Sequence, residues 1–535
     1  METVNKSRGV LRKKHYLYLT EFFAGMSVMA VELGASRLLA PYFSSSQIVW
    51  TIIIGTIMIA MALGNIYGGR SADRDPDPDK LYSRLLISAV WTAAIPVLGK
   101  FVILLISGLL VVTVSTNFLI WAAFLACMLI FVYPLFLLGT CTPSLVKYTV
   151  GSLDDSGKVV GGLGAANTIG SIIGTFVPTF LSIPAFGTAV TFLIFSGILL
   201  ALAAVYFISC KRRLVMTAVC AVLFVICCVF GTTAGFAFWE KDLTYEGESV
   251  YNYLQVREDD KRTILSTNVI FGVQSVKMKQ GGLSGLYYDC AMAAPMMTDK
   301  PCGKGCDILI LGMGTGTYAS QCSEYIENVS LEGVEIDEKI TSLAREYFSL
   351  PESVKVTTYD GRAYLGVSDK KYDVIMVDAY QDITIPFQMS SAEFFSLVRS
   401  HLTDSGVMVV NMNMRSDRAG SVNERLTDTI CSVFPEVYTA DVQGSTNREL
   451  FASAKKGMAD RLAQSTELLS DEQLASLMTT VRNDLSPCEQ KGAPLTDDRA
   501  PVELLGMQVI DDLISKELAY YRQRIREDGI KAILE

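Results

Sequence analysis

Glycines and acidic residues stand together at predicted strand ends in the C-terminal half of the chain, where they could hold a nucleoside. A buried strand at 307–311 runs directly into the glycine turn Gly312–Gly316, and the next predicted strand, 328–335, ends at Glu335. Glycines let the backbone turn tightly and approach a ligand closely, and a carboxylate at the following strand tip can accept hydrogen bonds from both ribose hydroxyls. The spacing from the glycine turn to Glu335 is close to the roughly 20 residues typical of such sites.

Two further acidic residues fall at predicted strand ends. The third strand of the series ends at Asp360, and the fourth, 372–378, ends at Asp378. Ligands of open α/β sheets bind outside the carboxyl ends of the strands, so we expect the glycine turn, Glu335, Asp360 and Asp378 to meet at one crevice. The segment after Asp378 is long for a connection between a strand and a helix, and long loops at a crevice often act as lids.

A sheet flanked by helices is needed to position these residues. Predicted strands and helices alternate from 307 to 411, which indicates parallel βαβ units. A short β-meander precedes them at 251–278, and amphipathic helices follow at 458–482 and 502–533. We expect an α/β Rossmann-like domain of the class I methyltransferase type, with a small N-terminal β-meander. Its C-terminal helices pack on the sheet or on a partner subunit.

The N-terminal half has a different character, because it consists of long apolar stretches. A stretch of about 20 residues is long enough to cross a hydrocarbon core of about 30 Å as a helix. The sequence therefore predicts a multi-span α-helical membrane domain, although Pro96 and Lys100 allow the third stretch to be two short pieces. The seven stretches lie at 17–40, 47–68, 85–110, 117–138, 161–183, 187–209 and 214–238.

Basic residues flank these stretches in three clusters, at 6–14, 70–84 and 211–213. Such clusters favour the cytoplasmic face of a membrane. With seven spans, the chain from 240 onward then lies outside the cytoplasm, whereas an enzyme that uses a nucleoside co-substrate is expected inside it. Either a span is miscounted, most simply around 85–115, or the C-terminal half faces outward. The sequence predicts a multi-pass cell-membrane protein and leaves the side of its catalytic half open.

The composition excludes several other functions. The net charge is −9, so no basic field exists to hold nucleic acid. The chain has only two His, and neither lies in the setting of a Ser-His-Asp site. Of the 12 Cys, Cys302 and Cys306 form the only tight pair, so we expect no metal site, and whether these two thiols pair stays open.

The chain length and the change of pattern near residue 240 predict several domains. With 535 residues the chain is too long for one ordinary domain. The predicted division is a membrane domain at 1–240, a small β domain at 241–298, a Rossmann-like nucleoside-binding catalytic domain at 299–456, and C-terminal helices that pack on it at 457–535.

These motifs together resemble the polyamine aminopropyltransferases, the spermidine synthase family, and especially its members with a fused membrane domain. The resemblance implies transfer of an aminopropyl group from decarboxylated S-adenosylmethionine to a polyamine such as putrescine, with release of methylthioadenosine. The expected partners are these small molecules and the lipid bilayer, with a homodimer as a further expectation. The matching strings are Tyr251-Asn-Tyr-Leu-Gln-Val, Gly-Val-Gln274-Ser, the glycine turn, Glu335-Ile-Asp337, Asp360-Gly361, Val-Asp378-Ala-Tyr and Leu495-Thr-Asp497-Asp498.

The resemblance also implies roles for individual residues. Asp378 matches the family's acid that holds the cationic amine and accepts its proton, and Asp382 is a candidate second carboxylate, one residue later than the usual spacing. Further substrate contacts are implied for Tyr288, Gln274 and Asn252. Contacts to the nucleoside co-substrate are implied for Gly312, Gly314, Thr315, Gly316, Glu335, Asp337, Asp360, Gly361 and Pro386.

Several positions depart from the family's pattern. Thr315 stands where the glycine turn usually carries an Asp that holds the aminopropyl ammonium, and Tyr288-Asp289-Cys290 replaces a Tyr-His-Glu string. A methyltransferase that uses intact S-adenosylmethionine is therefore an alternative, because the missing acid makes room for a carboxylate. A membrane transporter or sensor whose α/β domain only binds a polyamine or nucleoside is another.

Overall fold

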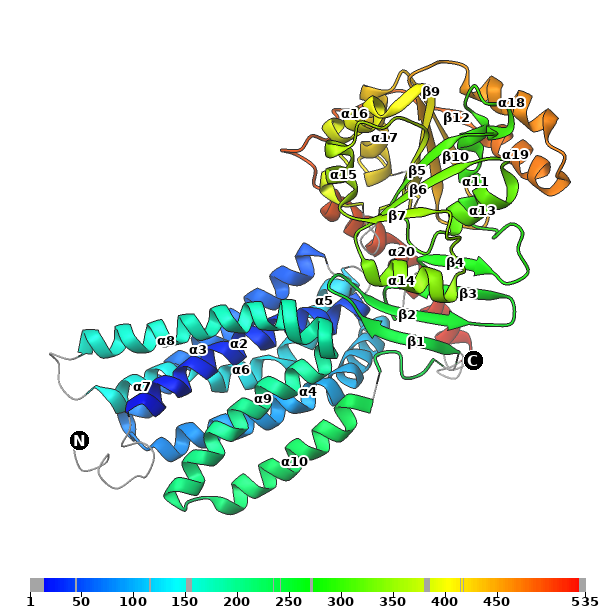
Figure 1. The fold of residues 1–535 in the computed structure, drawn as a ribbon. Coiled ribbons are helices and arrows are strands. Elements are labelled where there is room, and N and C mark those ends of the chain that lie inside the picture. Colours follow the sequence, from blue (N-terminus) through cyan, green and yellow to red (C-terminus); the bar gives the residue numbers. More distant parts are fainter. Residues whose placement is uncertain are drawn as a thin grey trace. The chain divides into compact units, whose positions relative to one another are not determined.

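Two compact units make up the chain in the computed structural model. The first comprises residues up to 239 together with 247–253 and the stretch from 515 on, and the second comprises 240–246 and 254–514. Each unit is described by itself (Figure 1). The residues described are 14–43, 46–114, 117–150, 156–233, 235–240, 242–269, 273–379, 385–413, 415–416 and 418–528.

Long apolar helices form the first unit. The helix α4 is continuous through Pro96, so the third predicted stretch is not divided. The helices α5 to α7 form one apolar segment that is bent by 49°. In chain order the elements are α2 (Lys14–Phe43), α3 (Gln47–Arg74), α4 (Pro78–Thr113), α5 (Phe118–Ile130), α6 (Val132–Gly139), α7 (Cys141–Thr149), α8 (Ser156–Val177), the π-helical turn η2 (Pro178–Ser182), α9 (Ile183–Cys210) and α10 (Leu214–Thr233).

Glycines of α8 bring its backbone against α2. A Cβ added to Gly170 would lie 1.9 Å from the carbonyl oxygen of Phe22, and one added to Gly174 would lie 2.1 Å from that of Met26. Only glycine fits at such distances, so small residues let the backbones of the two helices pack closely. Because both residue numbers increase together, α8 runs in the same direction as α2.

The helix α9 runs in the opposite direction along α2. Phe192, early in α9, lies against Gly34, and the carbonyl of Leu202, late in α9, accepts a hydrogen bond from Tyr16. The chain reverses at Gly187, whose φ is +82°. The stretch from α8 to α9, which is 55 residues long, is therefore a hairpin of two spans. Among the described residues, five helices are long and apolar enough to cross a membrane, or six if the bent pair is one span, with the stretch from α8 to α9 counted once. The count of seven membrane spans stays a prediction.

Polar and basic side chains gather at one end of this bundle. Thr20 of α2 lies 3.1 Å from the hydroxyl of Tyr82 in α4, and Asp79 of α4 forms a 2.7 Å ion pair with Arg212 just after α9. We call this the basic end. The other basic residues on the helix ends and turns there are Lys14, Arg70, Arg74, Lys80, Arg84, Lys147, Lys158, Lys211 and Arg213.

The connection to the second unit lies at the opposite end of the bundle. Arg37, near the end of α2, donates a 3.3 Å hydrogen bond to the carbonyl of Ser249. Lys100, in the second half of α4, donates a 2.9 Å hydrogen bond to the carbonyl of Gly235, which follows α10. The chain therefore leaves the first unit at the end away from the basic end.

An eight-stranded sheet organises the second unit, with strand order β12-β10-β11-β9-β8-β5-β6-β7. The strands β9, β8, β5, β6 and β7 are parallel neighbours, whereas β10, β11 and β12 are antiparallel. The predicted Rossmann-like α/β fold is thus confirmed. The bounds are β5 (Asp307–Leu311), β6 (Ser330–Glu335), β7 (Lys355–Thr358), β8 (Tyr372–Val377), β9 (Leu402–Met412), β10 (Glu436–Asp441), β11 (Arg448–Ser453) and β12 (Ser486–Pro487).

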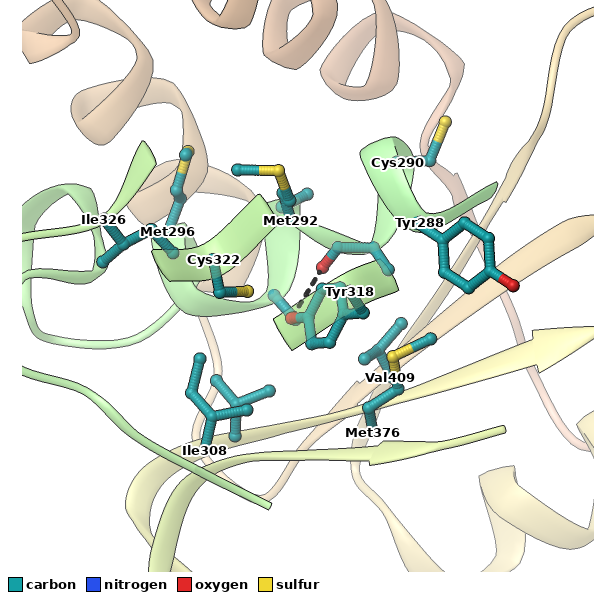
Figure 2. Packing of buried hydrophobic residues seen from close by; sticks show 14 of the residues in the cluster. Tyr288, Cys290, Met292, Met296, Ile308, Tyr318, Cys322, Ile326, Met376 and Val409 are labelled. Atoms are coloured by element: carbon teal, nitrogen blue, oxygen red, sulfur yellow. Dashed lines mark hydrogen bonds between the residues drawn. The ribbon is translucent and has the colours of Figure 1, made fainter. Parts of the chain in front are cut away.

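Helices cover both faces of this sheet (Figure 1). One face carries α11 (Tyr287–Ala291), α12 (Ala293–Met296), α13 (Thr317–Tyr325), α18 (Met458–Leu468) and α19 (Glu472–Asp484), and the other carries α15 (Gly361–Val367), α16 (Ala392–Ser400) and α17 (Val422–Val433). Figure 2 shows the core of the first face, where Tyr288, Met292 and Tyr318 lie above Met376 and Val409. Burial of these apolar side chains fixes α11 over the strand ends.

A smaller antiparallel sheet precedes the large one, as predicted, with strands β1 (Leu243–Glu248), β2 (Tyr253–Glu258), β3 (Arg262–Ser266) and β4 (Ser275–Met278). β1 was not predicted. Leu254, Val256 and Leu265 of this sheet pack against α14 (Glu338–Tyr347).

The C-terminal helices differ from the prediction at one point. The helix expected at 458–482 is two helices, because Asp471 begins α19 by accepting a hydrogen bond from the backbone of Leu474. A last helix, α20, spans Val502–Asp528.

Candidate active site

The glycine turn follows β5 and comes very close to the end of β8. Gly312 has a φ of +84°, and a Cβ there would lie 2.5 Å from the carbonyl oxygen of Asp378. Gly314 and Gly316 also have positive φ, of +54° and +79°. Left-handed backbone conformations of this kind favour glycine. The turn therefore places the backbone of 312–316 directly beside Asp378, as predicted.

Glu335 at the end of β6 faces the same turn. Its Oε2 accepts a 2.9 Å hydrogen bond from the backbone N–H of Gly314, and its Oε1 accepts a 3.1 Å bond from that of Asp337. Burial raises the pKa of Glu335 to about 7, although both backbone bonds lower it. Asp337 is buried and serves the adjacent helix, since it accepts from the backbone of Lys339 at the start of α14.

Asp360 marks the third strand end and begins a helix. Its Oδ1 accepts a 2.8 Å hydrogen bond from the backbone of Ala363, which caps α15. A Cβ added to Gly361 would lie 3.5 Å from the Cβ of Leu311, the last residue of β5. The start of α15 therefore lies next to the glycine turn, and Asp360 keeps one carboxylate oxygen outside the cap.

Asp378 is held by two donors. The hydroxyl of Tyr287 donates a 2.6 Å hydrogen bond to Oδ2, and the side-chain amide of Asn411 donates a 2.9 Å bond to Oδ1. Burial raises the pKa of Asp378 to about 7, and both hydrogen bonds act against that increase. A partly exposed carboxyl with such a pKa can exchange a proton near neutrality, as a general base must.

Three polar side chains lie next to Asp378: Asn411 of β9, Asn447 just before β11, and Glu449 of β11. Asn447 donates a 2.8 Å hydrogen bond to the side-chain oxygen of Asn411. Glu449 pairs across the strands with Asn411, so the two side chains share the sheet face of Asp378. Glu449 is fully buried, and neither carboxylate oxygen has a hydrogen-bond partner among the described residues. Burial, together with the Asp378 charge, raises the pKa of Glu449.

The two adjacent tyrosines of α11 have different hydrogen-bond partners. Tyr287 reaches Asp378, whereas the hydroxyl of Tyr288 donates a 2.7 Å hydrogen bond to the backbone carbonyl of Gln274. Their rings lie 3.9 Å apart between centroids. Sequence reasoning named Tyr288 and missed Tyr287, Asn411 and Glu449. Only Asn411 carried a signal, because it stands at the end of a predicted strand like the acidic residues.

Thr315, at the position that departs from the family pattern, is buried under the small sheet. Its backbone N–H donates a 3.3 Å hydrogen bond to the hydroxyl of Ser275, while its own Oγ1 has no partner within the described part of the chain. It borders a recess of about 170 Å³ that Thr317 and Gln321 also line. Gln274 stands next to Ser275, at the edge of β4.

The string around Asp497 supports the far side of the crevice. Asp497 accepts 2.7 and 2.6 Å hydrogen bonds from Arg362 of α15 and a 2.5 Å bond from Ser391, which caps α16. Arg362 first, and Ser391 second, lower the pKa of Asp497 to about 2. Arg362 also donates to the carbonyl of Gln388 at 2.8 Å. The segment that follows Pro386 is thereby tied to α15.

Two predicted site residues, Asp382 and Asn252, do not belong to the described residues of the second unit. Asp382 lies outside the described residues, together with its neighbours 380–384. Asn252 belongs to the first unit, where its backbone N–H donates to the hydroxyl of Ser249 at 2.8 Å. The glycine turn, Glu335, Asp360 and Asp378 do gather at neighbouring strand ends.

The sequence of this chain is similar to proteins of known family. Residues 286–440 match the family described as spermine/spermidine synthase domain. A probable polyamine aminopropyl transferase of Bifidobacterium longum is 53% identical over 347 residues, which are 62% of this chain and 77% of that protein. The chain belongs to the polyamine aminopropyltransferases. The aminopropyltransferase of Vibrio vulnificus is 27% identical over 304 residues, 53% of this chain and 97% of that one.

Solved structures include a probable spermidine synthase from Corynebacterium glutamicum, with 17% identity and a TM-score of 0.37 over 47% of this aminopropyltransferase and 98% of that chain. Family membership decides between the three functions that the sequence left open. The reaction is aminopropyl transfer to a polyamine, and the co-substrate is decarboxylated S-adenosylmethionine rather than the intact molecule. The methyltransferase and non-catalytic sensor alternatives are set aside.

Proposed function

We propose that this aminopropyltransferase acts as a spermidine synthase, with putrescine as the amine and Asp378 as the general base. The observation that carries this proposal is the position of Asp378, beside the glycine turn and held by Tyr287 and Asn411. A diamine is cationic at neutral pH, so its attacking nitrogen must lose a proton. A carboxyl whose pKa is about 7 can attract the ammonium and then accept that proton.

The chemical step needs little from the protein beyond position and charge. The neutral amine nitrogen attacks the aminopropyl carbon, the new N–C bond forms as the C–S bond breaks, and the sulfonium electron pair returns to sulfur in methylthioadenosine. The proton of the attacking nitrogen goes to Asp378. Since the leaving group is neutral, no acid catalyst is required, and orientation of the two reactants supplies much of the acceleration.

Tyr287 and Asn411 are the proposed positioning residues for the base. Each occupies one oxygen of Asp378 with a hydrogen bond, so the carboxylate cannot rotate freely. Both bonds favour the ionised form and keep the pKa from rising further. The amine approaches the remaining lone pairs of the same carboxylate.

The nucleoside is proposed to lie across the glycine turn. Glu335, already bonded to the backbone of the turn, accepts the ribose hydroxyls, and Asp360 with Gly361 lines the adjoining part of the crevice. Thr315 offers a hydroxyl where the family carries an acid, so it contributes no charge to the aminopropyl ammonium. That ammonium is then held chiefly by polar groups outside the turn.

The first unit is proposed to cross a membrane with its basic end in the cytoplasm. Lys and Arg gather at that end, and the positive-inside preference places such residues on the cytoplasmic face. The chain leaves the bundle at the other end, so residues from 240 on face away from the cytoplasm. A protease added to intact cells should remove a C-terminal tag, and protection of the tag until the cells are permeabilised would overturn this assignment. Association of two chains stays a prediction.

The test of function uses the full-length protein in nanodiscs. With decarboxylated S-adenosylmethionine and putrescine we expect spermidine and methylthioadenosine in equal amounts. Asp378→Asn should reduce turnover by about 10²–10⁴-fold while methylthioadenosine still binds in calorimetry. Unchanged turnover in this variant would refute the assigned base, and turnover with cadaverine or spermidine but not with putrescine would refute the assigned acceptor.

A further inference from the structure

Glu21 is a fully buried carboxyl inside the membrane-spanning part of the first unit. It lies seven residues from the start of α2, roughly two helical turns inside the basic end. Its side chain has no exposed surface, and it points among three helices, since it bonds to residues of α7 and α8. Acidic residues at such places are costly and are usually functional.

Both hydrogen bonds to Glu21 arrive at the same oxygen. The hydroxyl of Thr142 in α7 donates to Oε1 at 2.5 Å, and the side-chain amide of Asn167 in α8 donates to Oε1 at 2.9 Å. The other oxygen, Oε2, is buried and has no hydrogen-bond partner among the residues that the structure describes. One oxygen therefore resembles a carbonyl and the other a hydroxyl.

Within the part of the chain that the structure describes, no basic side chain pairs with Glu21. The basic residues nearest in the fold have other partners: Arg84 donates to Ser71, Lys147 pairs with Asp73, Arg212 pairs with Asp79, and Arg213 donates to Ser83. Other titratable groups on the elements packed around this part of α2 are His15, Tyr16, Tyr18, Tyr82, Cys141, Tyr148, Lys158, Tyr206 and Cys210. A buried anion without a counter-ion is strongly unfavourable.

We propose that Glu21 is a proton-binding site of the membrane unit. In the packed arrangement the carboxyl carries the proton on Oε2, while Thr142 and Asn167 hold Oε1. The proton is exchanged with the aqueous phase at the basic end. Asp79 is the opposite case, because Tyr206 donates a hydrogen bond to one of its oxygens and Arg212 pairs with the other.

The proton couples the arrangement of three helices. Loss of the proton leaves a charged Oε2 that needs a donor, so α7 or α8 must move relative to α2 to supply one. Glycine packing allows α8 almost no movement toward α2. The response therefore falls to α7, whose first turn is itself packed against α3, because a Cβ added to Gly68 would lie 3.0 Å from Pro143, so the movement is small. Proton binding thus favours the packed state of the bundle.

Carbodiimide modification tests the proposal, because dicyclohexylcarbodiimide reacts with protonated carboxyls in apolar surroundings. The full-length protein in nanodiscs is treated from about pH 5 to about 9, and adducts are located by peptide mass spectrometry. We expect an adduct on Glu21 at neutral pH that declines as the pH rises, at least about tenfold above that on Asp79. Equal labelling of the two residues would overturn the proposal.

Infrared spectroscopy provides a readout that does not depend on reagent access. In the difference spectrum against the unaltered protein, Glu21→Gln should remove one component of the protonated carboxylic C=O band, and Glu32→Gln, the matched change on the same helix, should leave that component in place. Glutamine keeps an acceptor for Thr142 and Asn167, and an unchanged melting temperature of the membrane unit in the full-length protein reports whether the variant is folded. A spectrum that Glu21→Gln leaves unchanged contradicts the proposal, whatever the labelling shows.

Discussion

At the residue scale, the proposed chemistry depends on a carboxyl whose proton affinity is set by its surroundings. Burial raises the pKa of Asp378 to about 7, and the hydrogen bonds from Tyr287 and Asn411 oppose it. Sequence patterns located Asp378 because a strand end is visible in a sequence. They could not locate its donors, because Tyr287 comes from a short helix distant in the chain and Tyr288 is the residue that the family string highlights.

The pH dependence of turnover follows from the same carboxyl. Asp378 must be ionised to accept a proton. We therefore expect kcat/KM to be low in acid and to rise as the pH increases through about 7. Tyr287→Phe removes a bond that lowers this pKa, and should move the acid limb of the profile to higher pH. Tyr288→Phe is the control, since Tyr288 bonds to a backbone carbonyl instead. A profile that Tyr287→Phe leaves in place would contradict the role given to this bond.

Glu449 makes the second unit less stable as the pH rises. A salt-bridged acid has the opposite effect, because it stabilises a folded chain at higher pH. The pKa of Glu449 in the folded chain lies above the ordinary value of 4.5, so the folded chain keeps a proton that the unfolded chain releases. Stability is therefore full at low pH and is lost as the pH rises above about 4.5 toward the folded value. Glu449→Gln should flatten this dependence and stabilise β9 and β11 at neutral pH by about 1–3 kcal/mol.

Hydrogen exchange in peptides of β9 and β11 measures this effect. Glu332→Gln is the matched control, because the pKa of Glu332 is lowered by hydrogen bonds from Tyr372 and Lys370 that outweigh its burial. That change should destabilise the sheet at neutral pH. Faster exchange in Glu449→Gln than in the unaltered protein would show that the buried carboxyl is ionised and satisfied.

At the element scale, the alternation of strands and helices was predictable, because the spacing of apolar residues within each strand or helix is visible over a short stretch of sequence. The glycine turn, the parallel strands and the meander all followed from such patterns. The break between α18 and α19 was missed, since the apolar period continues across it and only the capping bond from Asp471 ends one helix and begins the next. β1 was missed because its residues are mostly partly exposed and lack clear alternation.

The glycine turn gives a direct test of backbone control. Gly312→Ala places a Cβ against the carbonyl of Asp378 and requires a left-handed conformation. We expect a loss of about 3 kcal/mol or more in stability, together with loss of methylthioadenosine binding in calorimetry. Gly366→Ala, in a helix of the same unit with open space around it, should change neither. Retained binding in Gly312→Ala would mean that the turn does not shape the nucleoside site.

At the scale of the whole molecule, the span count was the point that the sequence left open. A single break near Pro96 would have reversed the side of the catalytic half, and the structure shows α4 continuous there. The sequence divided this region into the stretches 161–183 and 187–209, but only the packing against α2 shows that α8 and α9 run in opposite directions. Local sequence patterns do not predict long-range contacts of this kind.

Transfer of labelled carbon is the measurement that tests the central claim most directly. The full-length protein is given putrescine with decarboxylated S-adenosylmethionine that carries heavy isotope in its aminopropyl group, and in a parallel reaction with S-adenosylmethionine that carries it in the methyl group. The account predicts labelled spermidine from the first reaction, none from Asp378→Asn, and no labelled amine from the second. A methylated amine from the second reaction, with no labelled spermidine from the first, would contradict it.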